Sequence, residues 1–353
     1  MHKFVILLLT AAVAWGQEPT GARELNNEGA RRFARGDYRG AEDLYGRALA
    51  AWKSGTPSRE FDMAVTMGNL AAVYRAQGRF TEAERLSLES LAIVERTAGR
   101  DSAAAATALN NLAELYRSRG DLGAAEPYAL RAVETAARVF GPGAPEAADS
   151  LHTLAAVYLG DGRRQEAAAL MARVLRTQEE ARGPRDPAVG VTLNNLAAAY
   201  IGLGRFTDAE QTARRAVDVL EQSVGAAHPT TAAAFNNLAQ ALRFEHRYAE
   251  AEPLYRRALE TWEGALGPSH PDVAKALANL ADFWHERGRE RGAESLYRRA
   301  IAIAECAYGP AHPETARLLA RLAEVYRAEG RFTESAKLER RAGVTPDLGP
   351  TVQ

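Results

Sequence analysis

Asparagine recurs at two fixed positions of a 42-residue pattern, and its side-chain amide has the chemistry that binds a peptide backbone. The first amide row lies one residue before a recurring leucine and comprises Asn27, Asn69, Asn111, Asn195, Asn237 and Asn279. The second amide row lies two residues before that leucine position and comprises Asn26, Asn110, Asn194 and Asn236. Because an amide both donates and accepts hydrogen bonds, such a row could pair with any extended main chain without reading its sequence.

The two rows supply seven candidate peptide contacts. They are Asn110, Asn111, Asn194, Asn195, Asn236, Asn237 and Asn279. The alternative is that these amides tie neighbouring helices together or cap helix ends. We expect the second amide row to face a ligand more often than the first.

Cations beside the rows, toward the C-terminal end, predict a preference for acidic or C-terminal peptides, because positive side chains attract carboxylates. Arg321 replaces an asparagine of the first amide row, and Lys275 and Arg317 lie five residues before the leucine. Gln240, two residues after the leucine, adds a further amide. Arginines also lie five residues after it, at Arg75, Arg117, Arg243 and Arg327. The alternative is an ordinary charged helix face in contact with water.

Three histidines at the same place in successive copies raise the question of a metal site. Each of His228, His270 and His312 directly precedes a proline. Zinc ligands must converge to about 2.0–2.1 Å from one ion, whereas neighbouring helices are spaced by about 10 Å. We therefore expect no metal site, and a structural role for these histidines in closing the turn before the proline.

The sequence carries no motif typical of an enzyme. It has no nucleophile elbow, phosphate loop, dinucleotide fingerprint or zinc-protease helix, so we expect neither catalysis nor a cofactor. Cys306 is the only cysteine, which excludes an intrachain disulfide, and its alanine-rich surroundings predict a buried side chain. The formal net charge of −1 gives no basic field that would attract nucleic acid.

The helices that must position these side chains are predicted by the 42-residue repeat. The leucine recurs without insertion or deletion at Leu70, Leu112, Leu154, Leu196, Leu238, Leu280 and Leu322. A fixed period of this length indicates a stacked repeat array. Within one copy, such as 193–217, apolar residues at helical spacing lie on both sides of Gly204, so each copy predicts two helices joined by a glycine turn.

The turn and the packing positions are equally regular. The turn glycine recurs at all copies except one, where His246 replaces it and predicts a left-handed residue that costs about 1–2 kcal/mol. Small residues at two matched positions, such as Ala197 and Ala209, let the paired helices approach closely. An aromatic residue four positions after the leucine is expected to fill the core beside them. These aromatic residues are Tyr74, Tyr116, Tyr158, Tyr200, Trp284 and Tyr326, and Leu242 takes the place once.

These residues resemble the tetratricopeptide repeat family, and most of all its kinesin-light-chain branch. The resemblance rests on Asn194-Asn195-Leu196-Ala197, on Arg79-Phe80-Thr81-Glu82-Ala83-Glu84 and on the linker Gly267-Pro268-Ser269-His270-Pro271, and it covers about 24–342. It implies an all-α, right-handed superhelical solenoid of about eight helix-turn-helix repeats whose first helices line a concave face. The C-terminal end also partly resembles the carboxylate clamp of chaperone-binding repeats, although Asn236 stands where the clamp has its leading lysine.

The expected organisation is a signal peptide over 1–16, a repeat array over 17–342 and a disordered tail over 343–353. His2-Lys3, the apolar run 4–13 and the small residues Ala14 and Gly16 are typical of a secretory signal cleaved before Gln17. We therefore expect an exported protein, periplasmic or secreted, with no stable membrane span after cleavage. The first and last copies carry polar residues typical of the wettable outer face of capping repeats, which favours a monomer. They are Glu28 in the leucine position of the first copy, and Lys337, Glu339, Arg340 and Arg341 at the end of the last helix.

A regular array presents the same face many times, which suits recognition better than catalysis. We therefore expect a non-enzymatic scaffold that binds an extended peptide or protein segment on the concave face. The alternative is a self-associating structural module that stacks through its ends.

Overall fold

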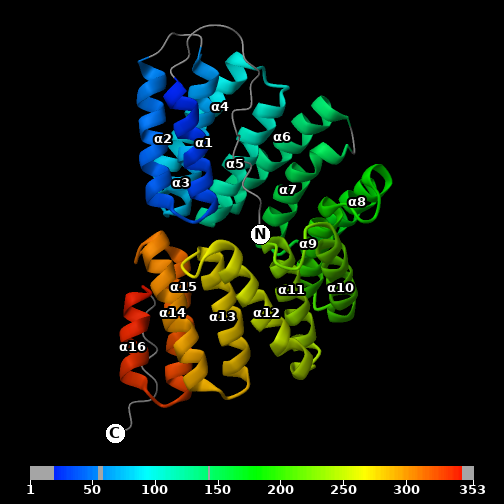
Figure 1. Ribbon diagram of the computed structural model, residues 1–353, viewed down its shortest axis with the longest axis vertical. Helices are drawn as coiled ribbons and strands as arrows, with labels where there is room; N and C mark the ends of the chain where they lie inside the picture. Colours follow the sequence, from blue (N-terminus) through cyan, green and yellow to red (C-terminus); the bar gives the residue numbers. More distant parts are fainter. Residues whose placement is uncertain (1–19, 55–58, 142–143, 344–353) are drawn as a thin grey trace. The chain divides into compact units, whose positions relative to one another are not determined.

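The computed structural model describes residues 20–54, 59–141 and 144–343, and within them it forms sixteen α-helices and one short 3-10 helix. The chain divides into two units, 1–223 and 224–353, each a stack of antiparallel helix pairs (Figure 1). The expected signal peptide, and the tail after Gly343, lie outside the described residues. The helices of the first unit are α1 (Thr20–Ala34), α2 (Tyr38–Lys53), α3 (Glu60–Ala76), α4 (Phe80–Thr97), α5 (Ala103–Arg119), α6 (Leu122–Phe140), η2 (Pro145–Ala147), α7 (Ala148–Gly160), α8 (Arg164–Arg182), α9 (Pro187–Gly202) and α10 (Phe206–Ser223). Those of the second unit are α11 (Pro229–Phe244), α12 (Tyr248–Leu266), α13 (Pro271–Glu286), α14 (Glu290–Tyr308), α15 (Pro313–Ala328) and α16 (Phe332–Arg341).

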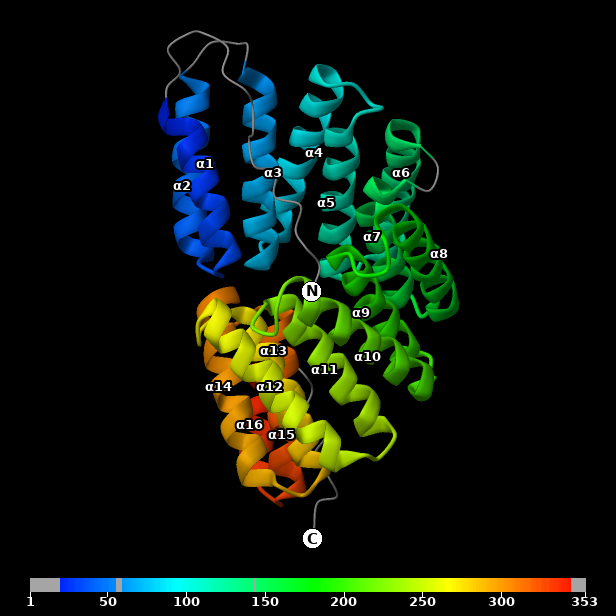
Figure 2. The same ribbon diagram turned by 45° about the vertical axis from the view of Figure 1, so that its right-hand side comes forward.

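The recurring leucine fixes how the helices pack. Odd-numbered helices carry it, and each of its seven copies is at most 5% exposed. The small residues on either side of the pair, such as Ala197 and Ala209, have no exposed surface. Each pair then stacks on the next within its unit, as α3 to α6 show in Figure 2. The expected all-α helical-repeat solenoid is therefore confirmed.

The turn inside each pair requires a left-handed residue, as the sequence predicts. The seven turn glycines have positive φ angles, for example 72° at Gly204, and His246 is the one non-glycine residue with a positive φ among the described residues, at 61°. His246 Nδ1 lies 2.7 Å from the hydroxyl of Tyr248, and this hydrogen bond offsets part of the backbone strain.

The three recurring histidines are helix N-caps, which confirms their structural role. The Nδ1 atoms of His228, His270 and His312 accept hydrogen bonds from backbone N–H groups two residues on, at 3.2, 3.1 and 3.1 Å. The following proline is the first residue of α11, α13 or α15, where its missing N–H costs nothing. Burial lowers the pKa of His312 despite the opposing charge of Glu314, so its ring is neutral at pH 7 and can accept.

The aromatic residues after the leucine differ from the prediction. Tyr116 and Tyr326 are buried, whereas Tyr74, Tyr158, Tyr200 and Trp284 are only half-buried, and Tyr74 and Tyr158 pack against the edge of the core. At Tyr74, Tyr158, Tyr200 and Tyr326 the arginine of the helix turn lies over the ring. The guanidinium carbon of Arg79 lies 3.9 Å from the ring centre of Tyr74, which is a cation–π contact.

We call this residue, one after the turn glycine, the turn arginine. It joins adjacent repeats: Arg79 Nη1 donates to Glu42 of the preceding repeat at 2.8 Å, and Nε donates to Glu82 of its own repeat at 2.9 Å. Arg163 makes the same two bonds to Glu126 and Glu166, at 2.7 and 3.0 Å. At Arg79, Arg163 and Arg331, one cation therefore contacts an aromatic ring, a carboxylate of its own repeat and a carboxylate of the preceding repeat.

Two further expectations need correction. Cys306 is exposed, because its position on α14 faces away from the helices that pack against it. Glu339, expected on the wettable outer face of the last repeat, is only 5% exposed and accepts hydrogen bonds from Arg327 and Ser335. The other charged residues expected on that face, Lys337, Arg340 and Arg341, are exposed.

Replacing a recurring leucine tests whether the repeats share one interior. Leu112 has no exposed surface and packs with Leu109, Ala83 and Leu154 of three successive repeats. We expect Leu112→Ala to lower the free energy of unfolding by about 2–5 kcal/mol, because it leaves a cavity. Urea denaturation followed by circular dichroism measures the change. Leu88→Ala, at a side chain 40% exposed, is the control and should cost about 0.5 kcal/mol or less. Equal losses would contradict the shared interior.

Candidate peptide-binding face

The second amide row is buried and links the first helices of successive repeats. In the second unit, Asn279 Nδ2 donates to Asn236 Oδ1 at 2.8 Å, from α13 to α11. In the first unit, Asn69 Nδ2 donates to Asn26 Oδ1 at 3.1 Å, from α3 to α1. All four asparagines of the second row are at most 8% exposed. These bonds match the alternative in which amides tie neighbouring helices, and they leave little of the second row to a ligand.

The same connection takes another form in the middle of the first unit. Asn110 Nδ2 donates to Ser150 Oγ at 3.0 Å, and Ser150 lies four residues before the leucine of the next repeat. His152 occupies the place of a second-row asparagine, and its Nε2 lies 3.1 Å from Thr192 Oγ1, which again precedes the next leucine by four residues. The sequence analysis missed this role of His152, although its position in the repeat identifies it.

The first amide row is more accessible and partly free to bind. Asn111 and Asn195 are half-buried, and their side chains make no hydrogen bond within the described part of the chain. The same holds for Gln240 on α11 of the second unit. Asn279 uses its Nδ2 for Asn236, whereas Asn237 accepts a long bond of 3.5 Å from Asn236. The unpaired amides of Asn111, Asn195 and Gln240 are therefore the groups best placed to meet a peptide backbone.

The three cations of the second unit all lie beside carboxylates that the sequence analysis did not include. Lys275 Nζ is 3.0 Å from Asp272, Arg317 is 2.8 Å from Glu314, and Arg321 is 3.8 Å from both Asp282 and Glu324. Burial would raise the pKa of Asp272, but the charge and hydrogen bond of Lys275 outweigh burial and hold that pKa below its ordinary value. An acidic ligand would therefore have to compete with carboxylates of this protein.

The arginines five residues after the leucine also have partners. Arg75 Nη1 donates to Ser118 of the next repeat at 3.0 Å, and Arg243 Nε donates to Glu286 of the next repeat at 2.6 Å. Arg117 pairs with Glu114 in its own helix at 2.8 Å, and Arg327 pairs with Glu339. Arg75 and Arg243 therefore help to hold successive first helices in line, whereas Arg117 and Arg327 have partners within their own repeats.

Within the described ranges, no group of three or more His, Cys, Asp or Glu side chains could hold a metal ion. Nor does any helix in the described part of the chain combine the length and apolar character needed to cross a membrane.

Comparison with protein-family models identifies the family of this helical repeat. A family model described as tetratricopeptide repeat matches residues 62–138, 106–180, 146–222, 230–305 and 285–342, and a second model with the same description matches 194–265. The chain belongs to the tetratricopeptide repeat family. No curated protein matches it.

Several solved structures share the fold. A Rap protein complexed with Competence and Sporulation Factor aligns with a TM-score of 0.67 at 14% identity, over 93% of this chain and 87% of that one. The apo quorum sensor NprR from B. thuringiensis aligns with a TM-score of 0.61 at 15% identity, over 91% and 85%. BtubC (BKLC) from P. vanneervenii aligns with a TM-score of 0.51 at 24% identity, over 63% and 89%. At 14–24% identity, these likenesses concern the fold alone.

The half-buried His152, at the second-row position, predicts a loss of stability in acid. Burial lowers the pKa of His152 to about 4 against the opposing charge of Asp149, whereas the unfolded value is 6.5. The folded pKa is the lower one, so the stabilisation is complete above the unfolded pKa and is lost as the pH falls toward 4. Between about pH 7 and about pH 5 this group alone should remove about 2 kcal/mol. Urea midpoints at the two pH values measure the loss.

The matched control is His152→Asn, which installs the residue of the sister repeats. Asparagine can still bond to Thr192 but does not titrate in this range. The acid-induced loss should therefore be smaller in the variant by about 2 kcal/mol. An identical loss in both proteins would show that His152 is not responsible.

Proposed function

We propose that this protein is a non-enzymatic scaffold that binds an extended peptide or protein segment along its first helices. The observation that carries the proposal is the set of half-buried amides without hydrogen bonds, Asn111 and Asn195 in the first unit and Gln240 in the second. Each presents both a donor and an acceptor at a regular position of the repeat. A peptide main chain offers the same groups in return and can pair with them without a specific side-chain sequence.

In this proposal the second amide row has a structural role and the first amide row binds the ligand. The second row sets the spacing of the first helices through bonds such as Asn279 to Asn236 at 2.8 Å. The first row and Gln240 then contact the ligand. The Rap protein was solved with Competence and Sporulation Factor bound, and NprR is described as a quorum sensor. At 14 and 15% identity these likenesses concern the fold, so the argument for binding rests on the amides of this chain.

For selectivity, we propose a contribution from Lys275, Arg317 and Arg321. An acidic peptide would bind there by exchanging its carboxylates for those of Asp272, Glu314 and Asp282. Because such an exchange replaces one ion pair by another, the preference should be modest and should weaken with salt. The second candidate function, stacking of monomers through their ends, would appear as a molar mass that rises with concentration in light scattering.

The binding test uses the unpaired amides. A dodecapeptide selected from a random displayed library on residues 17–353 should bind the double variant Asn111→Ala, Asn195→Ala of the first unit at least about tenfold more weakly, because each lost hydrogen bond contributes about 0.5–1.5 kcal/mol. Fluorescence anisotropy measures the affinity. The urea midpoint should not change, since these two amides make no hydrogen bond within the described residues.

Two controls separate binding from folding. Asn110→Ala removes the bond to Ser150 and should lower stability by about 1 kcal/mol. Arg85→Ala, at a side chain 69% exposed on α4, should change neither quantity. If the double variant keeps full affinity, or loses stability in parallel with affinity, the proposal that these amides bind the peptide fails.

We also propose that the protein is exported by the signal over 1–16. The support is the short basic start, the apolar run and the small residues Ala14 and Gly16. Expressed with its leader in a bacterial host, the exported chain should begin at Gln17, as read by N-terminal sequencing. Ala14→Lys should block cleavage and Glu18→Gln should not. Recovery of the uncleaved wild-type chain from the cytoplasm would contradict export.

A further inference from the structure

The turn arginine normally has a carboxylate of its own helix on Nε. Five turns place Asp or Glu three residues after this arginine, and in all five Nε donates to it. The pairs are Arg79–Glu82 at 2.9 Å, Arg163–Glu166 at 3.0 Å, Arg205–Asp208 at 2.7 Å, Arg247–Glu250 at 2.8 Å and Arg331–Glu334 at 3.1 Å. The bond is thus a standard part of this repeat.

The turn between α13 and α14 keeps the arginine but lacks the carboxylate. Gly292 stands where the sister repeats have Glu or Asp, and within the described part of the chain Arg289 makes hydrogen bonds only through Nη1, to Glu252 at 3.0 and 3.1 Å. Its side chain is 56% exposed, against 33–39% for Arg79, Arg163, Arg247 and Arg331 and 53% for Arg205. The feature that sets Arg289 apart is therefore its Nε, which has no carboxylate partner among the described residues, whereas an internal carboxylate accepts from Nε in the five sister turns.

The ring of Trp284 explains why position 292 is a glycine. Trp284 occupies the position that holds tyrosine in most repeats, and a Cβ atom at Gly292 would lie 2.6 Å from its Cε3. The larger ring and a side chain at position 292 are therefore incompatible without a shift. The result is an open cavity of about 570 Å³, which is lined by Arg256, Trp284 and the segment 288–292.

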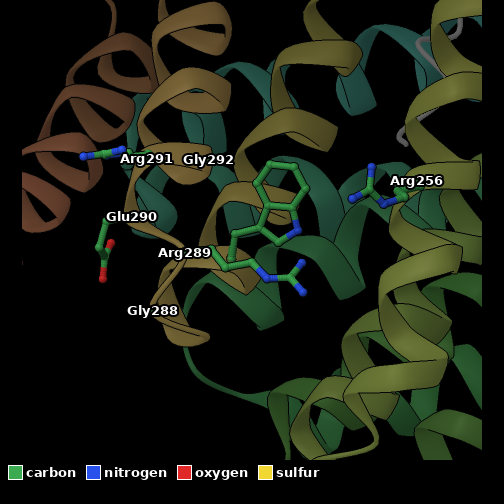
Figure 3. Close-up of a pocket in the computed structure, with 7 residues that line it drawn as sticks. Arg256, Gly288, Arg289, Glu290, Arg291 and Gly292 are labelled. Carbon is green, nitrogen blue, oxygen red and sulfur yellow. The ribbon is translucent and has the colours of Figure 1, made fainter.

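The charges around this cavity favour an anion. Figure 3 shows Arg289 extending toward the side from which Arg256 enters, while Glu290 and Arg291 extend the other way. Glu290 pairs with His285 at 2.6 Å. Arg256 and Arg289 share one carboxylate, Glu252, at 2.9 and 3.0 Å, so this group carries one excess positive charge. Arg256 also lies 5.1 Å from the centre of the Trp284 ring and fixes one wall.

We propose that this cavity binds a carboxylate side chain of an acidic peptide, in the place that the protein's own Glu or Asp takes in the sister repeats. The ligand carboxylate accepts from Nε and Nη2 of Arg289, a geometry that matches the planar guanidinium edge. The methylene groups of the ligand lie against Trp284. The site uses α12, α14 and the turn at the end of α13, and it includes no residue of the amide rows, so it is independent of the function proposed above.

The experiment follows the arginine Nε–H groups by NMR in the full-length chain. With 15N at arginine Nε, the Arg289 resonance, assigned with Arg289→Lys, should shift saturably on addition of N-acetyl-hexaglutamate. N-acetyl-hexaglutamine should cause no shift. Arg205 is the control in the same spectrum, because Asp208 already occupies its Nε. A shift at Arg205 equal to that at Arg289, or an equal effect of the glutamine peptide, would overturn the proposal.

A designed pair of variants tests the vacant position itself. Trp284→Tyr with Gly292→Glu recreates the residues of the sister repeats, so its own glutamate should occupy Arg289 and weaken peptide binding at least about fivefold. Trp284→Tyr alone keeps Gly292 and should still bind. An unchanged Arg247 resonance, from the unit that carries the substitutions, shows that both variants are folded. Equal affinity of the two variants, or a response of Arg289 to inorganic phosphate without a response to hexaglutamate, would contradict a carboxylate site.

Discussion

Adjacent repeats are joined, at Arg79, Arg163 and Arg331, by one cation placed between three partners. The turn arginine stacks on the aromatic ring of its own first helix, bonds to a carboxylate of its own second helix and bonds to a carboxylate of the preceding repeat, as Arg79 does with Tyr74, Glu82 and Glu42. Burial of leucine and alanine side chains stabilises the stack, but the hydrophobic interaction is non-directional. The arginine adds direction, because its planar donors accept only certain positions of the neighbouring helix.

The vacant position at Gly292 and the amide rows have the same origin, which is that polar groups of one repeat are paired by equivalent groups of the next. A repeated structure satisfies a polar group with an identical neighbour, so any copy that lacks the neighbour leaves a ready-made donor or acceptor. Arg289 lacks the carboxylate of its own helix, and Asn111, Asn195 and Gln240 lack hydrogen bonds to other side chains. A binding site in such a protein can arise when one repeat loses an internal hydrogen-bond partner. No new functional group is needed, because a ligand that supplies the missing partner fits the geometry already present.

Features set by local sequence could be predicted, whereas features set by the next repeat could not. The buried leucines, the left-handed His246 and the capping histidines depend on residues within one turn of each other. The exposure of Cys306 and of the aromatic rings depends on which side of a helix its neighbours cover. The pairing of the amides was predictable in principle, because Asn26 and Asn69, like Asn236 and Asn279, are 43 residues apart, one more than the period. The sequence alone did not show which asparagines this pairing buries.

The short reach of these contacts has a consequence for how the chain acquires its structure. The hydrogen bonds described above join residues no more than 43 positions apart, which is one neighbouring repeat. Formation of each contact therefore closes only a short loop, and the entropic barrier to folding stays low. The earliest repeats can become ordered on the ribosome while later ones are still being synthesised, because a helix pair makes contacts only with the adjacent pairs.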